Sequence, residues 1–228
     1  MTGDPYKVQT RHYVAVDCVI FGYEEGELKV LIHHRGFEPS VGKWSLLGGF
    51  VEENETLGDA ARRVLYKTTG LQNIYQEQVH AFSKIDRDSA GRVISVAYYA
   101  LIRISQQDND LVREHDAKWW PVADLPELIF DHREMIQYSL IQLQKKAGYE
   151  LIGKELLGEP FTITKLKKLY QAIFLHELDA GNFRKKVLSL GLLQNTGLKD
   201  KTESKKGAFY YKYKKDRQEQ INLTPIVK

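Results

Sequence analysis

Apolar and polar residues alternate, or form short apolar runs, through most of the first 130 residues, and this pattern predicts a β-rich domain. A strand over 12–23 and a strand over 28–33 flank the turn at 24–27, so the two form a hairpin. Further strands are expected over 44–51, 74–85, 92–104 and 119–122. Apolar residues at helical spacing predict two helices, over 55–69 and 131–146. Strands mixed with two helices in about 150 residues are typical of one α+β domain.

The composition changes between Gly148 and Gly158, which predicts a boundary between a domain of residues 1–150 and a domain of residues 151–228. After it, an apolar stripe predicts a first helix that Thr162 or Thr164 can cap. Asp179 is suited to cap a second helix over 180–190. Two extended segments around the charged loop 199–206 predict a closing β-hairpin, so this part has the order of a winged helix-turn-helix.

The charge of the chain is unevenly distributed. The whole sequence has 33 Lys and Arg against 30 Asp and Glu. From Lys154 to Lys228, 16 basic residues stand against 8 acidic residues, and the preceding part has 17 against 22. A concentration of positive charge at one end is expected of a segment that binds phosphates, although a solvated basic surface would give the same balance.

Cysteine content and apolar runs indicate the compartment. The single cysteine, Cys18, lies in an apolar run and is expected to be a small buried core residue in a reducing cytoplasm. No apolar run has the length of a bilayer span, and the first ten residues do not have the pattern of a signal peptide. We therefore expect a cytoplasmic protein with no membrane partner.

The segment 49–71 resembles the Nudix signature, in which residues of set types stand at fixed distances along a loop and a helix. Gly49, Glu55, Arg63, Gly70 and Leu71 occupy signature positions without insertion or gap. This agreement predicts a Nudix-like α/β/α sandwich.

The same segment lacks the acidic residues that Nudix hydrolases use to hold a divalent metal. Val64, Lys67 and Thr68 stand where the signature has glutamates. Mg²⁺ prefers carboxylate oxygens, and Lys67 would place a positive charge beside it. We therefore expect no metal, no cofactor and no enzymatic activity. The alternative is a divergent hydrolase that acts on a nucleoside diphosphate derivative, and the retained Glu55 has a second interpretation as a favourable charge near a helix N-terminus.

The second helix of the C-terminal region is expected to contact DNA. Its core face is Phe183, Val187 and Leu190, so polar and basic side chains point outward. Arg and Asn read base edges in the major groove, and Lys more often binds phosphate. The candidate DNA-binding residues on both helices and on the hairpin are Thr164, Lys165, Asn182, Arg184, Lys185, Lys186, Lys205 and Lys206.

Taken together, the chain resembles the Nudix-related transcriptional regulators of bacteria, in which a degenerate Nudix domain precedes a winged helix. The segments that carry the resemblance are 37–39, 44–50, 85–88, 92–99 and 182–186. The resemblance is greatest to the sugar-responsive branch, which includes an arabinose regulator. Another branch represses genes of NAD metabolism and senses ADP-ribose.

The resemblance implies a homodimer that binds a palindromic double-stranded operator and a small-molecule effector that alters DNA affinity. A sugar such as L-arabinose is the favoured effector, with a role in carbohydrate metabolism, and ADP-ribose or a related nucleotide is second. Sugar recognition needs hydrogen-bonding groups beside an apolar or aromatic surface. The candidate effector-binding residues are Arg35, Glu38, Trp44, Asp86, Arg87, Asp88 and Tyr98.

Overall fold

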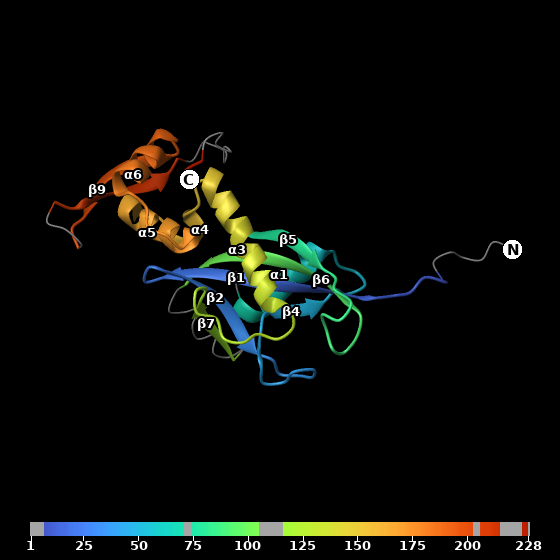
Figure 1. Ribbon diagram of the computed structural model, residues 1–228. Helices are drawn as coiled ribbons and strands as arrows, with labels where there is room; N and C mark the ends of the chain where they lie inside the picture. Colours follow the sequence, from blue (N-terminus) through green and yellow to red (C-terminus); the bar gives the residue numbers. More distant parts are fainter. Residues whose placement is uncertain (1–6, 71–73, 105–115, 203–205, 215–224, 228) are drawn as a thin grey trace.

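The computed structural model describes residues 7–70, 74–104, 116–202, 206–214 and 225–227. Within these residues a larger domain is built on a seven-stranded sheet and a smaller domain on a three-stranded sheet (Figure 1). The structure confirms the predicted α+β class, a Nudix-like sandwich followed by a winged helix. None of the described helices combines the length and apolar character that a bilayer span requires.

The large sheet is centred on β1 (Tyr13–Glu24). This strand runs parallel to β6 (Val93–Arg103) and antiparallel to β2 (Glu27–His34) and β4 (Leu47–Phe50). The outer strands are β5 (Gln76–Phe82) beside β6, and β3 (Trp44–Ser45) and β7 (Ala117–Pro121) beside β2. Because β1 is central and covered on both faces, its sequence is a nearly continuous apolar run rather than an alternating one.

Two helices cover opposite faces of this sheet, α1 (Leu57–Thr69) and α3 (His132–Tyr149). Successive side chains of a strand point to opposite faces. Cys18 and Ile20 of β1 accordingly pack in one core cluster with α1, and Val19 and Phe21 pack in another with α3. This arrangement is the α/β/α sandwich that the signature segment predicted.

Helix α1 begins two residues later than the sequence pattern predicted. Thr56 is its N-cap: the Thr56 hydroxyl accepts from the Asp59 amide at 3.2 Å, and the Asp59 carboxylate accepts from the Thr56 amide at 3.1 Å. This reciprocal pair is a capping box. Gly70, with φ of 67°, ends the helix as expected. Glu55 is thereby left outside the helix, with its side chain free to pair elsewhere.

The smaller domain contains α4 (Lys154–Leu157), β8 (Phe161–Thr162), α5 (Ile163–Phe174), α6 (Ala180–Ser189), β9 (Leu193–Asp200) and β10 (Ala208–Tyr213). Its sheet has the order β8-β10-β9. The predicted caps are confirmed, because Thr162 accepts from the Lys165 amide at 3.1 Å and Asp179 accepts from the Asn182 amide at 2.7 Å. The sequence did not reveal α4 and β8, which are too short to show a period.

The two domains share one hydrophobic core cluster. Leu143 and Ala147 of α3 belong to the same buried cluster as Leu166 and Tyr170 of α5. Helix α3 extends to Tyr149, three residues beyond the prediction, and so reaches the smaller domain. The predicted boundary at residue 150 therefore lies beside a region where side chains of both domains pack together.

Candidate functional site

A pocket opens in the larger domain where strands of the sheet meet the beginning of α3. Residues from β1, β2, β3, β4 and β6 form its walls, together with the loop after β2, the segment before β6 and the start of α3. The lining residues are Ala15, Asp17, His33, Arg35, Phe37, Ser45, Leu46, Gly48, Gly49, Phe50, Arg87, Asp88, Val93, Phe130 and His132.

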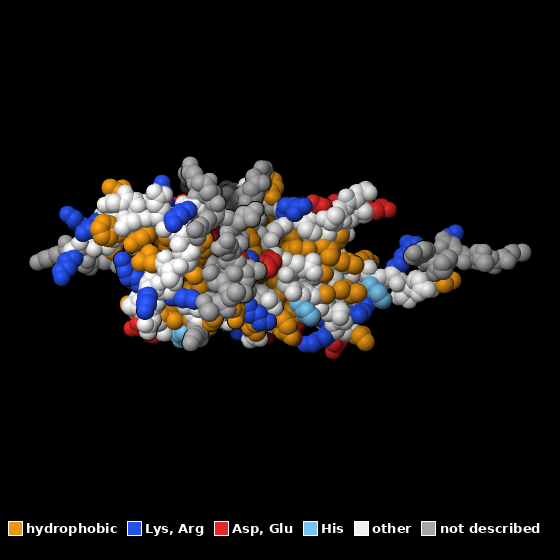
Figure 2. All heavy atoms as spheres, turned by 90° about the horizontal axis from the view of Figure 1, so that it is seen from above, with side chains coloured by type: hydrophobic (Ala, Val, Ile, Leu, Met, Phe, Trp, Pro, Cys, Tyr) orange, Lys and Arg blue, Asp and Glu red, His pale blue; other side chains and the backbone are white. Residues whose placement is uncertain are grey.

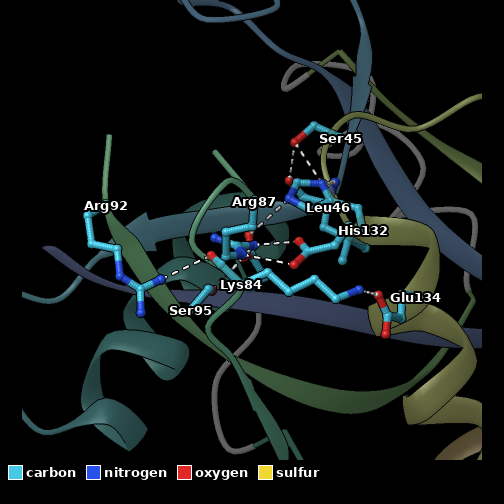
Figure 3. A network of polar contacts seen from close by, with 10 residues as sticks. Ser45, Leu46, Lys84, Arg87, Arg92, Ser95, His132 and Glu134 are labelled. Atoms are coloured by element: carbon cyan, nitrogen blue, oxygen red, sulfur yellow. Dashed lines mark hydrogen bonds and ion pairs between the residues drawn. The ribbon is translucent and has the colours of Figure 1, made fainter. Parts of the chain in front are cut away.

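A buried polar network forms the floor of this pocket (Figure 3). The Arg87 guanidinium, 3% exposed, donates two hydrogen bonds to Asp131, at 2.9 and 2.7 Å. Its Nη2 atom lies 3.7 Å from Asp17 Oδ2, which also accepts from the Ser95 hydroxyl at 2.6 Å. Burial alone would lower the pKa of Arg87, but the Asp131 hydrogen bonds and the Asp17 charge raise it. Arg87 is therefore a fixed cation between two carboxylates.

His132 is held as a neutral imidazole beside this network. Its Nδ1 atom accepts from the Leu46 amide at 3.0 Å, so the neutral ring carries its hydrogen on Nε2. Nε2 faces Asp17, with Oδ1 3.7 Å away. Burial lowers the pKa of His132, and the Asp17 charge opposes this effect only in part. The ring thus presents a donor toward Asp17.

Gly48 allows the wall of the pocket to approach Asp17 closely. The two residues are direct partners across β1 and β4. A Cβ atom at Gly48 would collide with the Asp17 carboxylate and would lie 2.9 Å from the Val16 carbonyl oxygen. A side chain at this position would therefore displace the carboxylate from the pocket floor.

A second basic side chain, Arg35, stands between two aromatic rings in the pocket wall. Its guanidinium carbon lies 3.9 Å from the centre of the Phe37 ring and 5.6 Å from the centre of the Phe130 ring. Burial lowers the pKa of Arg35, and the Asp88 charge opposes that change. A guanidinium can bind a phosphate, and flat rings beside it can stack on a planar group of the same ligand.

Three of the seven candidate effector-binding residues line this pocket, namely Arg35, Arg87 and Asp88. Trp44 instead stacks on His34, with ring centres 3.7 Å apart, and lines an adjacent groove. That groove touches the pocket only through Phe130.

The other three candidates lie away from the pocket lining. Glu38 accepts from the Ser40 amide at 3.0 Å in an exposed loop, and Asp86 is exposed in a turn. Tyr98 is 8% exposed in the α1-side core cluster and donates to Gln78 at 3.2 Å. Tyr98 was misplaced because the direction of a side chain in a two-sided sheet cannot be read from an apolar run.

Sequence reasoning missed Asp17, His33 and His132. Asp17 did leave a signal, because it interrupts the apolar run of β1 and is only 8% exposed. A buried carboxylate in a central strand requires a partner, which here is Arg87. His132 follows a loop and begins a helix, and nothing in its local sequence distinguishes it from a surface histidine.

The segment that resembles the Nudix signature forms an ion pair rather than an acidic cluster. Glu55 accepts hydrogen bonds from Arg63, including one from Nε at 2.9 Å, and from the Glu52 amide at 2.8 Å. The Arg63 hydrogen bond is the main cause of a lowered pKa at Glu55. The carboxylate is thus already used to hold the loop before α1.

The residues at the missing glutamate positions do not fit a divalent metal. Val64 is buried in the core, Lys67 is exposed, and the Thr68 hydroxyl donates to the Val64 carbonyl at 2.9 Å. Within the described residues, no group of three or more His, Cys, Asp or Glu side chains is arranged to hold a metal ion. A hard cation prefers several oxygen ligands, and these side chains do not offer them.

The candidate DNA-binding residues gather on the smaller domain, where Lys and Arg side chains are prominent at the end of the molecule formed by α5, α6 and β9 (Figures 1 and 2). Asn182, Arg184 and Lys185 are exposed on α6, and Lys186 is half-buried there. Thr164 and Lys165 are exposed at the start of α5, and Lys206 is exposed beside β10. Lys205 lies outside the described residues.

Lys165 and Arg184 each contact a residue of the smaller domain. Lys165 Nζ lies 3.3 Å from Asp200 Oδ2 at the end of β9, so it ties the first strand of the wing to α5. Arg184 Nη2 lies 3.4 Å from the Tyr211 hydroxyl, a long hydrogen bond that a DNA contact can replace. An exposed basic helix beside a β-hairpin has the geometry to bind a DNA groove and its phosphates.

Comparison with known proteins covers both domains. Residues 11–139 match the model of the NUDIX domain, and residues 153–213 match the NrtR DNA-binding winged helix domain. The chain is 29% identical over 204 residues to the ADPR responsive transcriptional repressor NtrR of Acinetobacter baylyi, covering 88% of this chain and 81% of that protein.

Two of the similar solved structures are of one protein, NrtR of Shewanella oneidensis. NrtR of Shewanella oneidensis, crystallised with a 27mer DNA, is 32% identical with a TM-score of 0.82, covering 93% of this chain and 98% of that chain. The NUDIX domain of that protein, crystallised with ADP ribose, is 32% identical with a TM-score of 0.50, covering 62% of this chain and 94% of that chain.

The fold and the two sites define a protein in which a Nudix domain precedes a winged-helix DNA-binding domain. The chain belongs to the NrtR family. Nothing in these comparisons supports the sugar-responsive branch, or the role in carbohydrate metabolism, that the sequence suggested.

Proposed function

We propose that this chain is a transcriptional repressor whose affinity for operator DNA is changed by ADP-ribose, or a closely related nucleotide, bound in the pocket of the Nudix domain. The observation that carries the proposal is the pocket itself. It combines the Arg35 cation on aromatic rings with a fixed Asp17, Arg87 and His132 network, in a chain that also has an exposed basic helix α6.

The chemistry of the pocket favours a nucleotide over a free sugar. ADP-ribose has a diphosphate, an adenine ring and ribose hydroxyls. Arg35 and the Phe37 and Phe130 rings suit the charged and planar parts, and the buried polar floor suits hydroxyls. L-Arabinose is neutral and non-planar, so it would leave the stacked Arg35 unused. The relatives named for ADP-ribose support the same choice.

We further propose that the protein binds its effector without hydrolysing it, and that it binds DNA as a homodimer. The Glu55 carboxylate already accepts hydrogen bonds from Arg63. The other metal-binding positions of the signature hold Val64, Lys67 and Thr68, which have no carboxylate. A two-fold symmetric dimer matches a palindromic operator, with one recognition helix in each half-site.

The test is fluorescence-anisotropy titration of duplex DNA from upstream of the chain's own gene, with a scrambled duplex as control. Titrations are repeated with ADP-ribose, with NAD and with L-arabinose. We expect specific binding that ADP-ribose shifts and L-arabinose does not. A shift by L-arabinose alone would overturn the nucleotide proposal. Light scattering of the free protein checks the dimer.

Hydrolysis is tested separately, by following ADP-ribose with Mg²⁺ or Mn²⁺ in a product assay. We expect no sustained turnover. Turnover that Glu55→Gln abolishes would show instead that the chain is a divergent Nudix hydrolase.

A further inference from the structure

Helix α3 connects the pocket to the smaller domain. Its first residue, His132, and the preceding Phe130 line the pocket, and Asp131 holds Arg87 through two hydrogen bonds. The helix has 18 residues and is therefore about 27 Å long. It contains no proline, and its only glycine, Gly148, is next to its last residue. A helix of this kind moves as a unit, so a shift at the pocket also appears at its far end.

The far end of α3 is fixed by charged groups and by the C-terminal segment. Lys146 Nζ lies 2.8 Å from Glu150 Oε2 and 3.6 Å from Glu77 Oε2 on β5. The Gly148 carbonyl accepts from the Ile226 amide at 2.6 Å. The position of residues 146–150 is thus set jointly by the sheet and by the last described residues of the chain.

Two tyrosine hydroxyls of the smaller domain hold the backbone that follows α3. The Tyr170 hydroxyl, on α5, donates to the Glu150 carbonyl and accepts from the Ile152 amide, both at 3.0 Å. The Tyr213 hydroxyl, on β10, donates to the Leu151 carbonyl at 3.0 Å. We call these three hydrogen bonds the linker latch. Tyr170 has no exposed surface, so its bonds form in a dry environment where an unpaired partner is costly.

We infer that the linker latch, with Tyr170 as its central positioning residue, transmits effector binding from the pocket to the DNA-binding domain. This inference rests on the proposed function. An effector changes DNA affinity only if it favours one of two arrangements of the chain. The latch joins the end of α3 directly to α5 and β10, the elements that carry α6 and the wing. Movement of α3 is thereby passed to the domain that binds DNA.

The test is a thermodynamic cycle on the full chain. DNA affinity is measured by anisotropy with and without saturating ADP-ribose, and ADP-ribose affinity is measured by calorimetry. The ratio of the two DNA dissociation constants is the coupling. Tyr170→Phe removes the hydroxyl and keeps the ring, and Tyr213→Phe does the same at the other contact. The matched control is Tyr138→Phe on α3, a residue that is 41% exposed and whose ring stacks on His80 of β5.

We expect Tyr170→Phe and Tyr213→Phe each to reduce the coupling ratio by about 3- to 30-fold, and Tyr138→Phe to leave it unchanged. ADP-ribose affinity of the free protein should stay within about twofold, because the latch is not part of the pocket lining. Wild-type coupling in both latch variants would overturn the inference while leaving the proposed function intact. A wild-type protein that binds DNA with no response to ADP-ribose would instead overturn the proposed effector and the inference with it. Should Tyr170→Phe fail to fold, Tyr213→Phe alone decides.

Discussion

At the scale of single residues, the pocket depends on buried groups that satisfy one another. Arg87 neutralises Asp131 directly and lies near Asp17, while Ser95 and His132 complete the surroundings of Asp17. A buried charge is stable only with such partners. Removing one partner leaves an unpaired charge in the protein interior, which is strongly destabilising. The network is therefore both the floor of the pocket and a condition for folding.

Replacing Arg87 tests this dependence. Arg87→Met keeps an unbranched apolar stem but removes the guanidinium, so the Asp17 and Asp131 carboxylates lose their cation. We expect a loss of about 3–5 kcal/mol in the free energy of unfolding at pH 7.5, measured by urea denaturation. The control is Arg62→Met, which breaks an exposed pair with Asp59 on α1 and should cost less than about 1 kcal/mol. If both variants lost the same free energy of unfolding, Arg87 would not be the cation that stabilises the buried carboxylates.

His132 should make stability depend on pH. Burial lowers the pKa of His132 and of His33 from the ordinary value of 6.5, so the folded chain binds fewer protons than the unfolded chain below that pH. Stability is therefore fully present above about pH 6.5 and falls as the pH falls below it. We expect urea midpoints to decrease between about pH 7.5 and 5.5, with a smaller slope in His132→Gln.

The matched control for that experiment is His80→Gln, on an exposed position of β5. It should keep the wild-type slope. Because His33 also contributes, His132→Gln reduces the slope without removing it. A slope that is unchanged in His132→Gln would show that His132 does not titrate as its burial predicts.

At the scale of elements, the sequence predicted what depends on local periodicity. The strands β1, β2 and β6 and the helices α1, α3, α5 and α6 were all expected within a few residues, because each has a long apolar pattern or a cap. The short α4 and β8 have neither. The pocket was predicted only in part, because Asp17, Arg87 and His132 come from three separate segments and meet only after folding.

Helix α6 carries the prediction that belongs to this scale. Arg184→Ala and Lys185→Ala should weaken operator binding and leave ADP-ribose binding unchanged, because both side chains are exposed on α6 and far in sequence from the pocket lining. Because a lysine that binds a phosphate displaces counterions from DNA, Lys185→Ala should also lower the slope of log affinity against log salt by about 1.

The matched control is Lys67→Ala, which removes the same charge from the exposed surface of α1 in the Nudix domain. It should change neither the operator affinity nor the salt slope measured by anisotropy. Operator affinity that is unaltered in both α6 variants would exclude α6 as the helix that binds DNA.

At the scale of the whole molecule, the two domains are joined by more than a linker. Helix α3 packs on the large sheet and on α5, and Gln144 donates to the Ile173 carbonyl at 2.9 Å. One buried cluster contains apolar residues of both domains. A shared core of this kind makes the domains depend on each other for stability, and it gives the linker latch a rigid frame on which to act.

The shared core predicts that the two domains unfold together. The chain has three tryptophans, Trp44, Trp119 and Trp120, all in the larger domain, so tryptophan fluorescence follows that domain alone. Far-ultraviolet circular dichroism also follows α5 and α6. If the domains form one cooperative unit, both signals give the same urea midpoint. Separate midpoints in the wild-type protein would show that the shared cluster does not couple them.

A substitution in the smaller domain makes this test sharper. Leu166 of α5 is fully buried in the shared cluster, so Leu166→Ala should cost about 2–5 kcal/mol. Under coupled unfolding, that loss lowers the tryptophan midpoint as much as the dichroism midpoint, although every tryptophan lies in the other domain. Leu198→Ala, at a position of β9 that is 66% exposed, should move neither signal. A Leu166→Ala protein whose dichroism midpoint falls while its tryptophan midpoint stays at the wild-type value would mean that the domains are stable independently. Signal transmission would then need no shared core, and the latch hydrogen bonds alone would have to position the DNA-binding domain.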